Sequence, residues 1–321
     1  MSTLSWRRIA APVALTATLA LGVAGCGSSD TDSAKGSAST GGIELKVGQF
    51  SWTAAAVETN ILADIAKAHP DLGVKSVKVT PVDPAPGWVG LGRGDLDLLT
   101  EVNLPNQQDF ADKAKATTSL VSETYGGATQ GWFVPRYAVE GAGAPAAGLT
   151  SIDQLNQYKS VFDGTLYDSD PGWVTSQQNK KRIKAYGLDY KQSNSSEAAL
   201  IAQVGRAFAK KQPILFYFYH PHWLFKKYDV VQLKEPNPYN PATSFKTDDK
   251  SAIPTLAAWI AVNNDLKTKA PEFYAALSKV KIPLADIEGL LEQVDAKKQQ
   301  PADVAQQWVD AHKTEIDQWV S

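Results

Sequence analysis

The sequence predicts an α/β fold of two lobes, joined by a hinge, with a ligand cleft between them. Short apolar strands alternate with amphipathic helices over residues 43–321, as in sheets that carry helices on their faces. A stretch rich in Gly, Ala and Pro at 138–148 divides this alternation into a first and a second series of strands and helices. A late apolar stretch at 256–262 would return the chain to the first series. We therefore expect the two ends of the body to form one lobe and its middle to form the other.

The first 25 residues have the form of a signal peptide. Arg7 and Arg8 precede an apolar run at 9–21, and small residues then lead to Cys26, the only cysteine of the chain. This order is typical of a secretory leader. The run Val23-Ala24-Gly25-Cys26 resembles a bacterial lipobox, so we expect Cys26 to carry a lipid that anchors the mature protein to a membrane, facing outside the cytoplasm. An ordinary signal peptide with an incidental cysteine is the alternative.

Residues 26–42 would join the lipid anchor to the folded body. After Cys26 the sequence reads GSSDTDSAKGSASTGG and has no apolar periodicity. Such a composition is typical of a flexible tether. With the lipid on Cys26, no thiol would remain for a disulfide, a thiolate metal site or a cysteine nucleophile.

The overall charge excludes several classes of partner. The chain has 32 Lys and Arg against 34 Asp and Glu, a net charge of −2. We therefore expect no basic face for nucleic acid and no polybasic membrane patch. After the leader, no apolar run reaches the roughly 18 residues that a membrane span requires.

The elements of the body follow from periodicity and from helix and strand signals. In the first series we expect strands at 43–47, 77–79 and 96–102, and helices at 55–68 and 88–93. The first helix carries Val57, Ile61, Leu62 and Ile65 on one stripe, and the strand–helix alternation predicts a parallel sheet.

The second series begins after a strand at 132–135. We expect a helix around Leu155 and Tyr158, a strand at 165–167, a helix at 175–186 and a strand at 214–219. Two amphipathic helices, at 284–297 and 301–320, would end the chain. The lobes would then comprise 43–140 with 250–321, and 141–249, with crossings near 137–150 and 243–255.

Four segments, in this order and spacing, resemble one family. They are GWFVPRY at 131–137, DPGW at 170–173, FYFYHPHW at 216–223 followed by KYD at 227–229, and IPL at 282–284. The set is similar to the glycine betaine/choline-type substrate-binding proteins of ABC importers, over nearly all of residues 43–320. The resemblance implies a type II periplasmic-binding-protein fold that closes on its ligand. It also implies delivery of the ligand to a membrane permease driven by a cytoplasmic ATPase, and it implies no cofactor.

A betaine ligand makes two chemical demands. Its quaternary ammonium has no N–H, so aromatic faces must hold it, at about 2 kcal/mol or more per desolvated ring. Its carboxylate needs donors, which backbone N–H groups at a helix start supply. The Pro171-Gly172-Trp173 turn lies just before the helix expected from Thr175. In the family such a turn supplies an aromatic wall in some members and backbone donors to the carboxylate. Here the ring of Trp173 could face the cleft while the N–H groups of Val174 and Thr175 point at the anion, and Gly172 of the same turn is a further candidate. Packing of Trp173 as a helix cap is the alternative.

Two further aromatic residues are candidates for the cage. Tyr219 ends the strand expected at 214–219, and ligands lie beyond the carboxyl ends of strands in open α/β sheets. By the resemblance it occupies a position of a cage tryptophan, and Trp52 matches a cage tryptophan of some branches. Both could instead be core residues, as we expect Trp88 and Trp132 to be.

The sequence departs from the family pattern at 101–108, EVNLPNQQ. The family usually has a tryptophan where Asn103 stands, and a histidine to the carboxylate near Gln107 or Gln108. Asn103 would open one side of the cage to a polar group, and Gln108 would donate to the carboxylate. His222, in Pro-His-Trp, also has a match in the family.

Other classes of function have weaker signals. His220 and His222 could face one way on an extended stretch, but no carboxylate or cysteine at ligand spacing joins them, so no metal site is expected. The sequence has no Gly-x-Ser-x-Gly and no phosphate-binding Gly-rich loop, so we expect no enzyme. A surface lipoprotein with a sensing or adhesive role, and no transported ligand, remains the alternative. Lys115, Lys180, Lys181 and Arg182 are expected on solvated helix faces.

Overall fold

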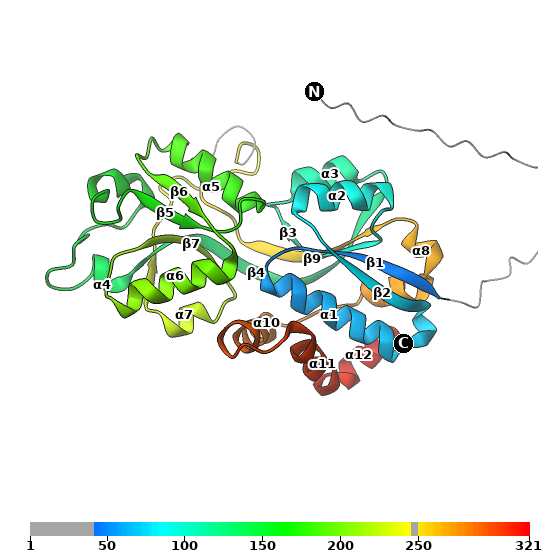
Figure 1. Cartoon of the computed structure of the whole chain (residues 1–321). Coiled ribbons are helices and arrows are strands. Elements are labelled where there is room, and N and C mark those ends of the chain that lie inside the picture. The colour runs from blue at the N-terminus through cyan, green and yellow to red at the C-terminus, as the bar shows by residue number, and fades with distance from the viewer. Residues whose placement is uncertain (1–41, 245–249) are drawn as a thin grey trace, which may run out of the picture. The chain divides into compact units, whose positions relative to one another are not determined.

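The computed structural model describes residues 42–244 and 250–321 (Figure 1). The predicted signal peptide at 1–25, the lipidation site Cys26 and all but the last residue of the linker at 26–42 lie outside the described residues. Among the described residues, no helix combines the length and the apolar character needed to cross a membrane.

The strands form one mixed sheet in the order β2-β1-β3-β9-β4-β7-β5-β6, with β8 also paired to β4. The bounds are β1 Ile43–Gln49, β2 Val74–Pro81, β3 Leu98–Leu104, β4 Thr118–Pro135, β5 Thr165–Asp168, β6 Lys191–Asn194, β7 Leu215–His220, β8 Val230–Gln232 and β9 Leu256–Asn263. β1 pairs in parallel with β2 and β3 as predicted, whereas β9 runs antiparallel between β3 and β4. The predicted parallel sheet is found for β1, β2 and β3, but β9 enters this half of the sheet from the opposite direction, so the sheet is mixed.

Strand β4 belongs to both halves of the sheet. It pairs with β9 as far as Ala128 and with β7 from Thr129 onward. We refer to residues 42–128 with 256–321 as lobe 1, and to residues 129–244 as lobe 2. The boundaries expected from the sequence, at 140/141 and 249/250, remain predictions, and the second lies at the edge of the undescribed segment. The change of partner along β4 indicates that the chain passes from lobe 1 to lobe 2 inside this strand.

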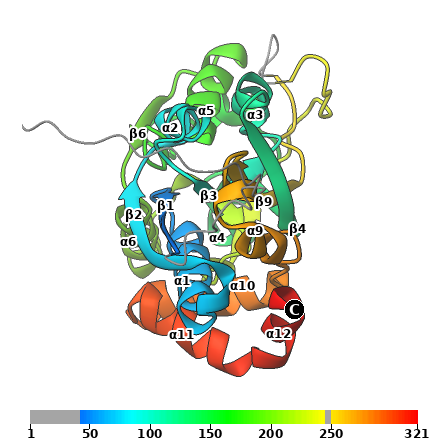
Figure 2. The ribbon, with the colours of Figure 1, turned by 90° about the vertical axis from the view of Figure 1, so that its right-hand side faces the viewer.

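Helices cover both faces of the sheet in lobe 1. In Figure 1, α1 lies on one face, and α2 and α3 lie on the other. The helix bounds are α1 Thr53–Ala68, α2 Pro84–Arg93, α3 Gln108–Ala114, α8 Leu266–Lys269, α9 Pro271–Leu277, α10 Leu284–Leu291, α11 Pro301–Ala311 and α12 Lys313–Val320. The predicted stripe of α1 is buried. Helices α10 and α11 pack against α1, and Figure 2 shows α11 and α12 on the side of α1 that faces away from β1 and β2.

Lobe 2 has the same layered construction. Helix α5 lies on one face of strands β5, β6 and β7, and helices α6 and α7 lie on the other (Figure 1). The bounds are α4 Arg136–Val139, a 3-10 helix at Ile152–Tyr158, α5 Val174–Ala185, α6 Glu197–Ala209 and α7 Leu224–Lys227. Helix α5 begins at Val174, one residue before the predicted start at Thr175, and Gly187 follows its end with a φ of 61°.

Two expectations about helices are corrected. Arg182 is not on a solvated face: it is fully buried, its Nε lies 2.5 Å from Glu235 Oε1, and its Nη2 donates to the carbonyl oxygen of Ser251. The cause is the segment that leaves β8, which covers this part of α5. The helix predicted at 301–320 is divided at His312 into α11 and α12, whereas the helix predicted at 284–297 is found as α10, continued by a π-helical turn at Glu292–Ala296.

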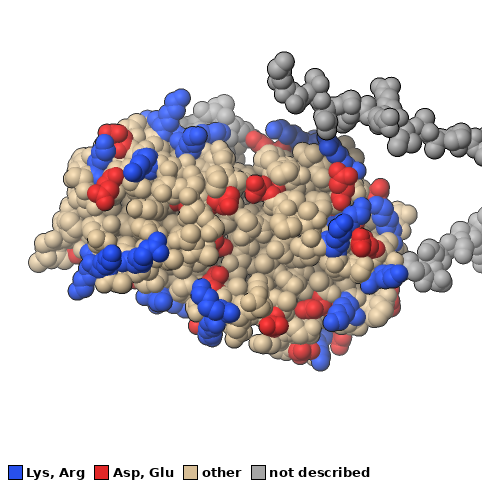
Figure 3. Space-filling view, viewed as in Figure 1, with Lys and Arg blue, Asp and Glu red and all other residues tan. Residues whose placement is uncertain are grey.

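The buried tryptophans and the distribution of surface charge agree with what the sequence predicts. Trp88 and Trp132 are 3% and 2% exposed, so both are core residues as predicted. Figure 3 shows basic and acidic side chains interspersed over one face of the molecule, with no extended field of a single sign.

Candidate functional site

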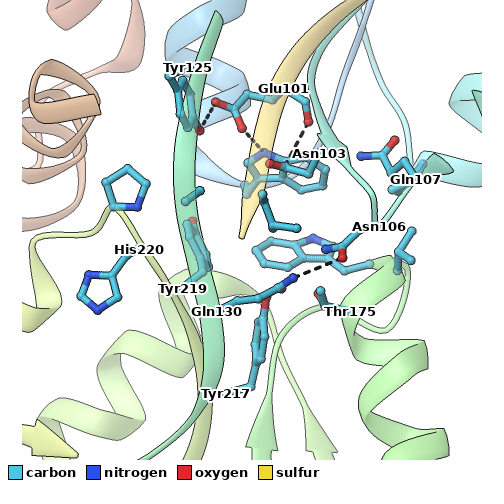
Figure 4. Close-up of a pocket in the computed structure, with 17 residues that line it drawn as sticks. Glu101, Asn103, Asn106, Gln107, Tyr125, Gln130, Thr175, Tyr217, Tyr219 and His220 are labelled. Carbon is cyan, nitrogen blue, oxygen red and sulfur yellow. Dashed lines mark hydrogen bonds between the residues drawn. The ribbon is translucent and has the colours of Figure 1, made fainter. Parts of the chain in front are cut away.

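A cavity of about 60 Å³ lies between the two lobes. A buried water needs roughly 10–15 Å³ on this measure, so the cavity has room for more than a single water molecule. Both lobes contribute to the lining, in which Figure 4 labels the polar members. The lining residues are Trp52, Pro84, Glu101, Asn103, Asn106, Gln107, Tyr125, Ala128, Gln130, Trp173, Val174, Thr175, Tyr217, Tyr219, His220, Pro221 and Leu256.

Three aromatic rings form one wall of the cavity. The Trp52 ring lies 5.2 Å from that of Trp173, nearly perpendicular to it, and Trp173 lies 6.1 Å from Tyr219. Trp52 and Trp173 are 7% and 5% exposed. Such a cluster presents negative π faces and ring edges in a desolvated space, which suits a cation that cannot donate a hydrogen bond.

Hydrogen bonds between the lobes hold this wall together. Trp173 Nε1, in lobe 2, donates to Ser51 Oγ in lobe 1 at 2.8 Å. The backbone N–H of Thr53, at the start of α1, donates to Glu197 Oε2 at 2.9 Å, and Glu197 begins α6. Because these bonds join residues of opposite lobes, the structure shows the lobes in contact around the cavity.

Glu101 lies at the lobe 1 end of the cavity, which is the upper end in Figure 4. The residue has a φ of 55°, and the pairing of β3 with β9 shifts register between Leu99 and Val102. A bulge of this kind re-aims a side chain, and the left-handed backbone is uncommon for a residue other than glycine. The sequence thus holds Glu101 in a constrained conformation at the cavity wall.

The carboxylate of Glu101 is buried and hydrogen bonded. Tyr125 donates its hydroxyl to Oε1 at 2.5 Å, and Trp52 Nε1 donates to Oε2 at 3.2 Å. Burial raises the pKa of Glu101 to about 7. Behind it lies Glu58 of α1, whose pKa is raised well above the ordinary value by burial and by the charge of Glu101.

Amide and hydroxyl groups line the opposite end of the cavity. Tyr217 donates its hydroxyl to Gln130 Oε1 at 2.7 Å, and Gln130 Nε2 donates to Asn106 Oδ1 at 3.2 Å. Val174 and Thr175 bring the first turn of α5 to the same cavity. The free N–H groups of a helix start attract anionic groups.

The structure brings six of the predicted site residues into the cavity wall: Trp52, Asn103, Trp173, Val174, Thr175 and Tyr219. Asn103 is half-buried, and its Nδ2 donates to the carbonyl oxygen of Glu101 at 3.2 Å. Gln108 and Gly172 lie outside, in a second pocket formed with residues of α2 and α5. Gln108 donates there to Asp112, one helical turn further along α3.

His222 lies behind the wall, fully buried, in a cluster that includes Glu197 and Asp295. Its Nε2 is 3.2 Å from Asp295 Oδ2, and Tyr219 donates its hydroxyl to Glu197. The backbone N–H of Leu224 donates to His222 Nδ1 at 3.1 Å. Because Nδ1 accepts this hydrogen bond, the N–H of the ring is Nε2, where a metal would need a lone pair, so this geometry favours a hydrogen-bonded support for Tyr219.

Several lining residues were not among the predicted site residues. Glu101 stands in the segment that departs from the family pattern, two residues before Asn103, and a charged residue near the end of a strand expected to be buried was a usable signal. Tyr217 is one of four consecutive aromatic residues, whose faces the sequence does not distinguish. Tyr125 and Gln130 belong to the part of β4 that was not predicted as strand.

Comparison with known proteins agrees with this geometry. Residues 43–311 match the family described as the substrate binding domain of the ABC-type glycine betaine transport system, and the chain belongs to this family. The glycine betaine-binding periplasmic protein OusX of Dickeya dadantii is 26% identical over 80% of this chain and 83% of its own length. A glycine betaine/proline betaine-binding periplasmic protein of Salmonella typhimurium is also 26% identical, with the same coverage.

Solved structures show the same fold. Lactococcal OpuAC, closed on glycine betaine, has a TM-score of 0.71 at 23% identity and covers 87% of this chain and 99% of its own. An ABC-transporter choline binding protein in complex with choline has a TM-score of 0.72 at 17% identity and covers 86% of this chain and 91% of its own. The two-lobe, type II periplasmic-binding-protein fold predicted from the sequence is thus confirmed.

Proposed function

We propose that the cavity between the lobes binds glycine betaine or a related quaternary-ammonium or zwitterionic compatible solute. The family consists of substrate-binding components of ABC importers rather than enzymes, and such a component delivers its ligand to permease subunits in the membrane. The observation that carries the proposal is the aromatic wall of Trp52, Trp173 and Tyr219, drawn from both lobes.

The two ends of the cavity suggest how the ligand lies. The ammonium would contact the three rings, each worth about 2 kcal/mol or more when desolvated. A carboxylate would point to the first turn of α5, where Val174, Thr175 and Gln130 offer donors. This orientation satisfies both ends of a small zwitterion by groups that are already in place, which lowers the cost of ordering the site on binding.

Thermal shift followed by calorimetry tests the proposal. Glycine betaine, proline betaine, choline and carnitine are the ligands, and glycine is the matched control because it keeps the carboxylate and lacks the methyl groups. We expect one or more quaternary amines, but not glycine, to raise the melting temperature in proportion to affinity and concentration. Absence of a shift with every quaternary amine would refute the proposed function.

The proposed cellular location of the protein rests partly on its relatives and partly on its own sequence. The curated relatives are named periplasmic proteins, and we propose that this chain is also extracytoplasmic and held to its membrane by a lipid on Cys26. The support is the apolar run followed by Val23-Ala24-Gly25-Cys26.

Replacing the predicted lipidated residue tests the anchor. Cys26→Ser should abolish labelling with a radioactive fatty acid and shift the protein from the membrane fraction to the soluble fraction or to an unprocessed precursor. The wild type, labelled in parallel, is the control. Lipid labelling that persists in the variant would contradict the assignment.

The alternative is a surface lipoprotein that senses or adheres through protein contacts. It would require an exposed apolar patch. Among the described residues, the exposed large apolar side chains are Val79 and Val89, which are too few for such a patch. The enclosed aromatic cavity therefore favours a small ligand.

A further inference from the structure

The cavity that we propose as the ligand site contains one acidic side chain and no basic counterpart. Glu101 lines it, and among the described lining residues there is no Lys or Arg. The lining histidine, His220, has its pKa lowered by burial. With Glu101 ionised, the cavity has a net negative charge that a zwitterion does not neutralise.

The position of Glu101 relative to the rings makes it a partner for a cation. Its Oε2 accepts the indole N–H of Trp52, and its Oε1 accepts the hydroxyl of Tyr125. The first bond fixes the Trp52 ring, which lies in contact with Trp173. A cation held by these rings therefore lies beside a buried carboxylate, in surroundings where opposite charges attract strongly.

The opposite end of the cavity can accept a hydroxyl group of a ligand as well as a carboxylate. Its donors and acceptors are the neutral groups of Asn106, Gln130, Tyr217 and Thr175, together with the start of α5. A hydroxyl group can both donate to and accept from such amides. A ligand with a hydroxyl in place of the carboxylate thus satisfies this end and also avoids repulsion by Glu101.

Resting on the proposed function, we propose that Glu101 is a specificity-determining residue: its carboxylate pairs with the ligand's ammonium and makes the site prefer a net cation of the choline class over the zwitterion glycine betaine. The bulge at β3 that aims this side chain is the structural device for the preference.

The pairing has a consequence for protons. Burial raises the pKa of Glu101 to about 7, so a fraction of the free protein carries a proton there near neutral pH. A bound cation favours the ionised form and expels that proton. The other titratable groups that act on Glu101 are Glu58 of α1, Tyr125 of β4 and Glu197 of α6. Each of these becomes negative on losing a proton, so none offers the ligand-free site a competing cation.

Calorimetry of the wild type tests this coupling without any mutation. Choline binding at about pH 7, measured in two buffers of different ionisation enthalpy, should release a fraction of a proton. Choline affinity should fall about tenfold between pH 8 and pH 6, because protonation of Glu101 competes with the cation. Binding without proton release, at an affinity that is constant over this range, would overturn the inference.

The variant Glu101→Gln supplies the second test. It should raise the choline dissociation constant about tenfold relative to that of glycine betaine. It should also remove the proton release. Glu140→Gln makes the same chemical change at an exposed ion pair with Arg136 and should change neither quantity. An unchanged ratio in a folded Glu101→Gln protein that binds both ligands would overturn this inference and leave the proposed function intact. Failure of the wild type to bind any quaternary amine would remove both.

Discussion

Trp173 and Tyr219 form the lobe 2 side of the aromatic wall, and each is fixed by a hydrogen bond outside the cavity. Trp173 donates to Ser51, and Tyr219 donates to Glu197. Trp173→Ala and Tyr219→Ala should each weaken binding of a quaternary amine by about 1–3 kcal/mol, through lost cation–π energy and lost burial. Calorimetry with the ligand identified by thermal shift measures the effect.

Two variants control this experiment. Tyr219→Phe keeps the ring and removes the hydroxyl, so it separates the π contribution from the bond to Glu197. Trp308→Ala removes an indole of α11 that bonds Asp286, away from the cavity, and should leave affinity nearly unchanged. Wild-type affinity in both alanine variants of the wall, with folding intact, would show that the ligand binds elsewhere.

Asn103 lines the cavity, and the resemblance to the family predicts that its amide stands where the cage usually has a tryptophan. Its Nδ2 already bonds the Glu101 carbonyl oxygen, so a simple trimethylammonium gains nothing from it. Asn103→Trp should strengthen glycine betaine relative to ligands that carry a polar group near the cation, if the enlarged side chain is accommodated. The dissociation constants of both ligand types, in wild type and variant, provide the ratio. A ratio that does not move in a folded, binding variant would place Asn103 outside the binding interaction.

The sequence predicted the aromatic members of the site better than its polar members. Trp52 and Trp173 directly precede helices, and Tyr219 lies near the end of a strand. Periodicity predicts such positions, and the resemblance to the family singled out these three residues among the aromatic ones. Glu101, Gln130 and Tyr217 face the cavity because of a bulge and of the register between β4 and β7. Register depends on pairing between distant segments, which one sequence does not reveal.

Helix α1 carries a buried acid at its interface with the sheet. Glu58 has a pKa raised well above the ordinary value, first by burial and then by Glu101. Its folded pKa exceeds its unfolded pKa, so its contribution to stability is complete below about pH 4.5 and declines as the pH rises. The loss amounts to about 1.4 kcal/mol per pH unit while the folded protein retains the proton.

Replacing this acid by its neutral isostere should remove the loss. We expect the free energy of unfolding of Glu58→Gln, relative to wild type, to rise by up to about 1.4 kcal/mol per pH unit between pH 5 and 7. Urea unfolding at several pH values measures it. Glu44→Gln, at an exposed residue of β1, should show no such trend. A constant difference between Glu58→Gln and wild type would mean that Glu58 is ionised in the folded protein.

Strand and helix prediction failed in one informative place. Residues 118–131 of β4 are rich in Ser, Thr and Gly and have irregular pairing with β9, with register shifts at three points. Local propensity is weak in such a segment, and its strand conformation depends on pairing with β9 and β7. By contrast, the apolar segments that became β1, β3 and β7 were predicted as strands from their residues alone.

Gly172 shows how closely the lobes approach around the cavity. A Cβ atom placed on Gly172 would lie 2.4–2.5 Å from the carboxyl atoms of Asp83, which precedes α2 in the other lobe. If the lobes close on the ligand, small-angle scattering of the wild type should show a smaller radius of gyration with saturating ligand. The change should be smaller in Gly172→Ala, because the added methyl group would hold the two lobes apart at this point. An identical radius with and without bound ligand in the wild type would contradict closure.

The matched control is Gly289→Ala. This glycine lies in α10, and a Cβ atom there would meet nothing within 4 Å. The variant should close as the wild type does. Equal compaction in both glycine variants would show that the Gly172–Asp83 approach does not limit closure.

The strand order also constrains the sequence of events as the chain acquires its structure. β9 lies between β3 and β4, although more than a hundred residues separate it from either along the chain. Until residue 263 is available, β3 and β4 each present an unpaired edge, whereas β5, β6 and β7 can pair within a continuous segment. Closing so long a loop is slow, and open edges invite association with other chains. Lobe 2 can therefore assemble first, and the insertion of β9 completes lobe 1, so a chain truncated before β9 would expose both edges to aggregation.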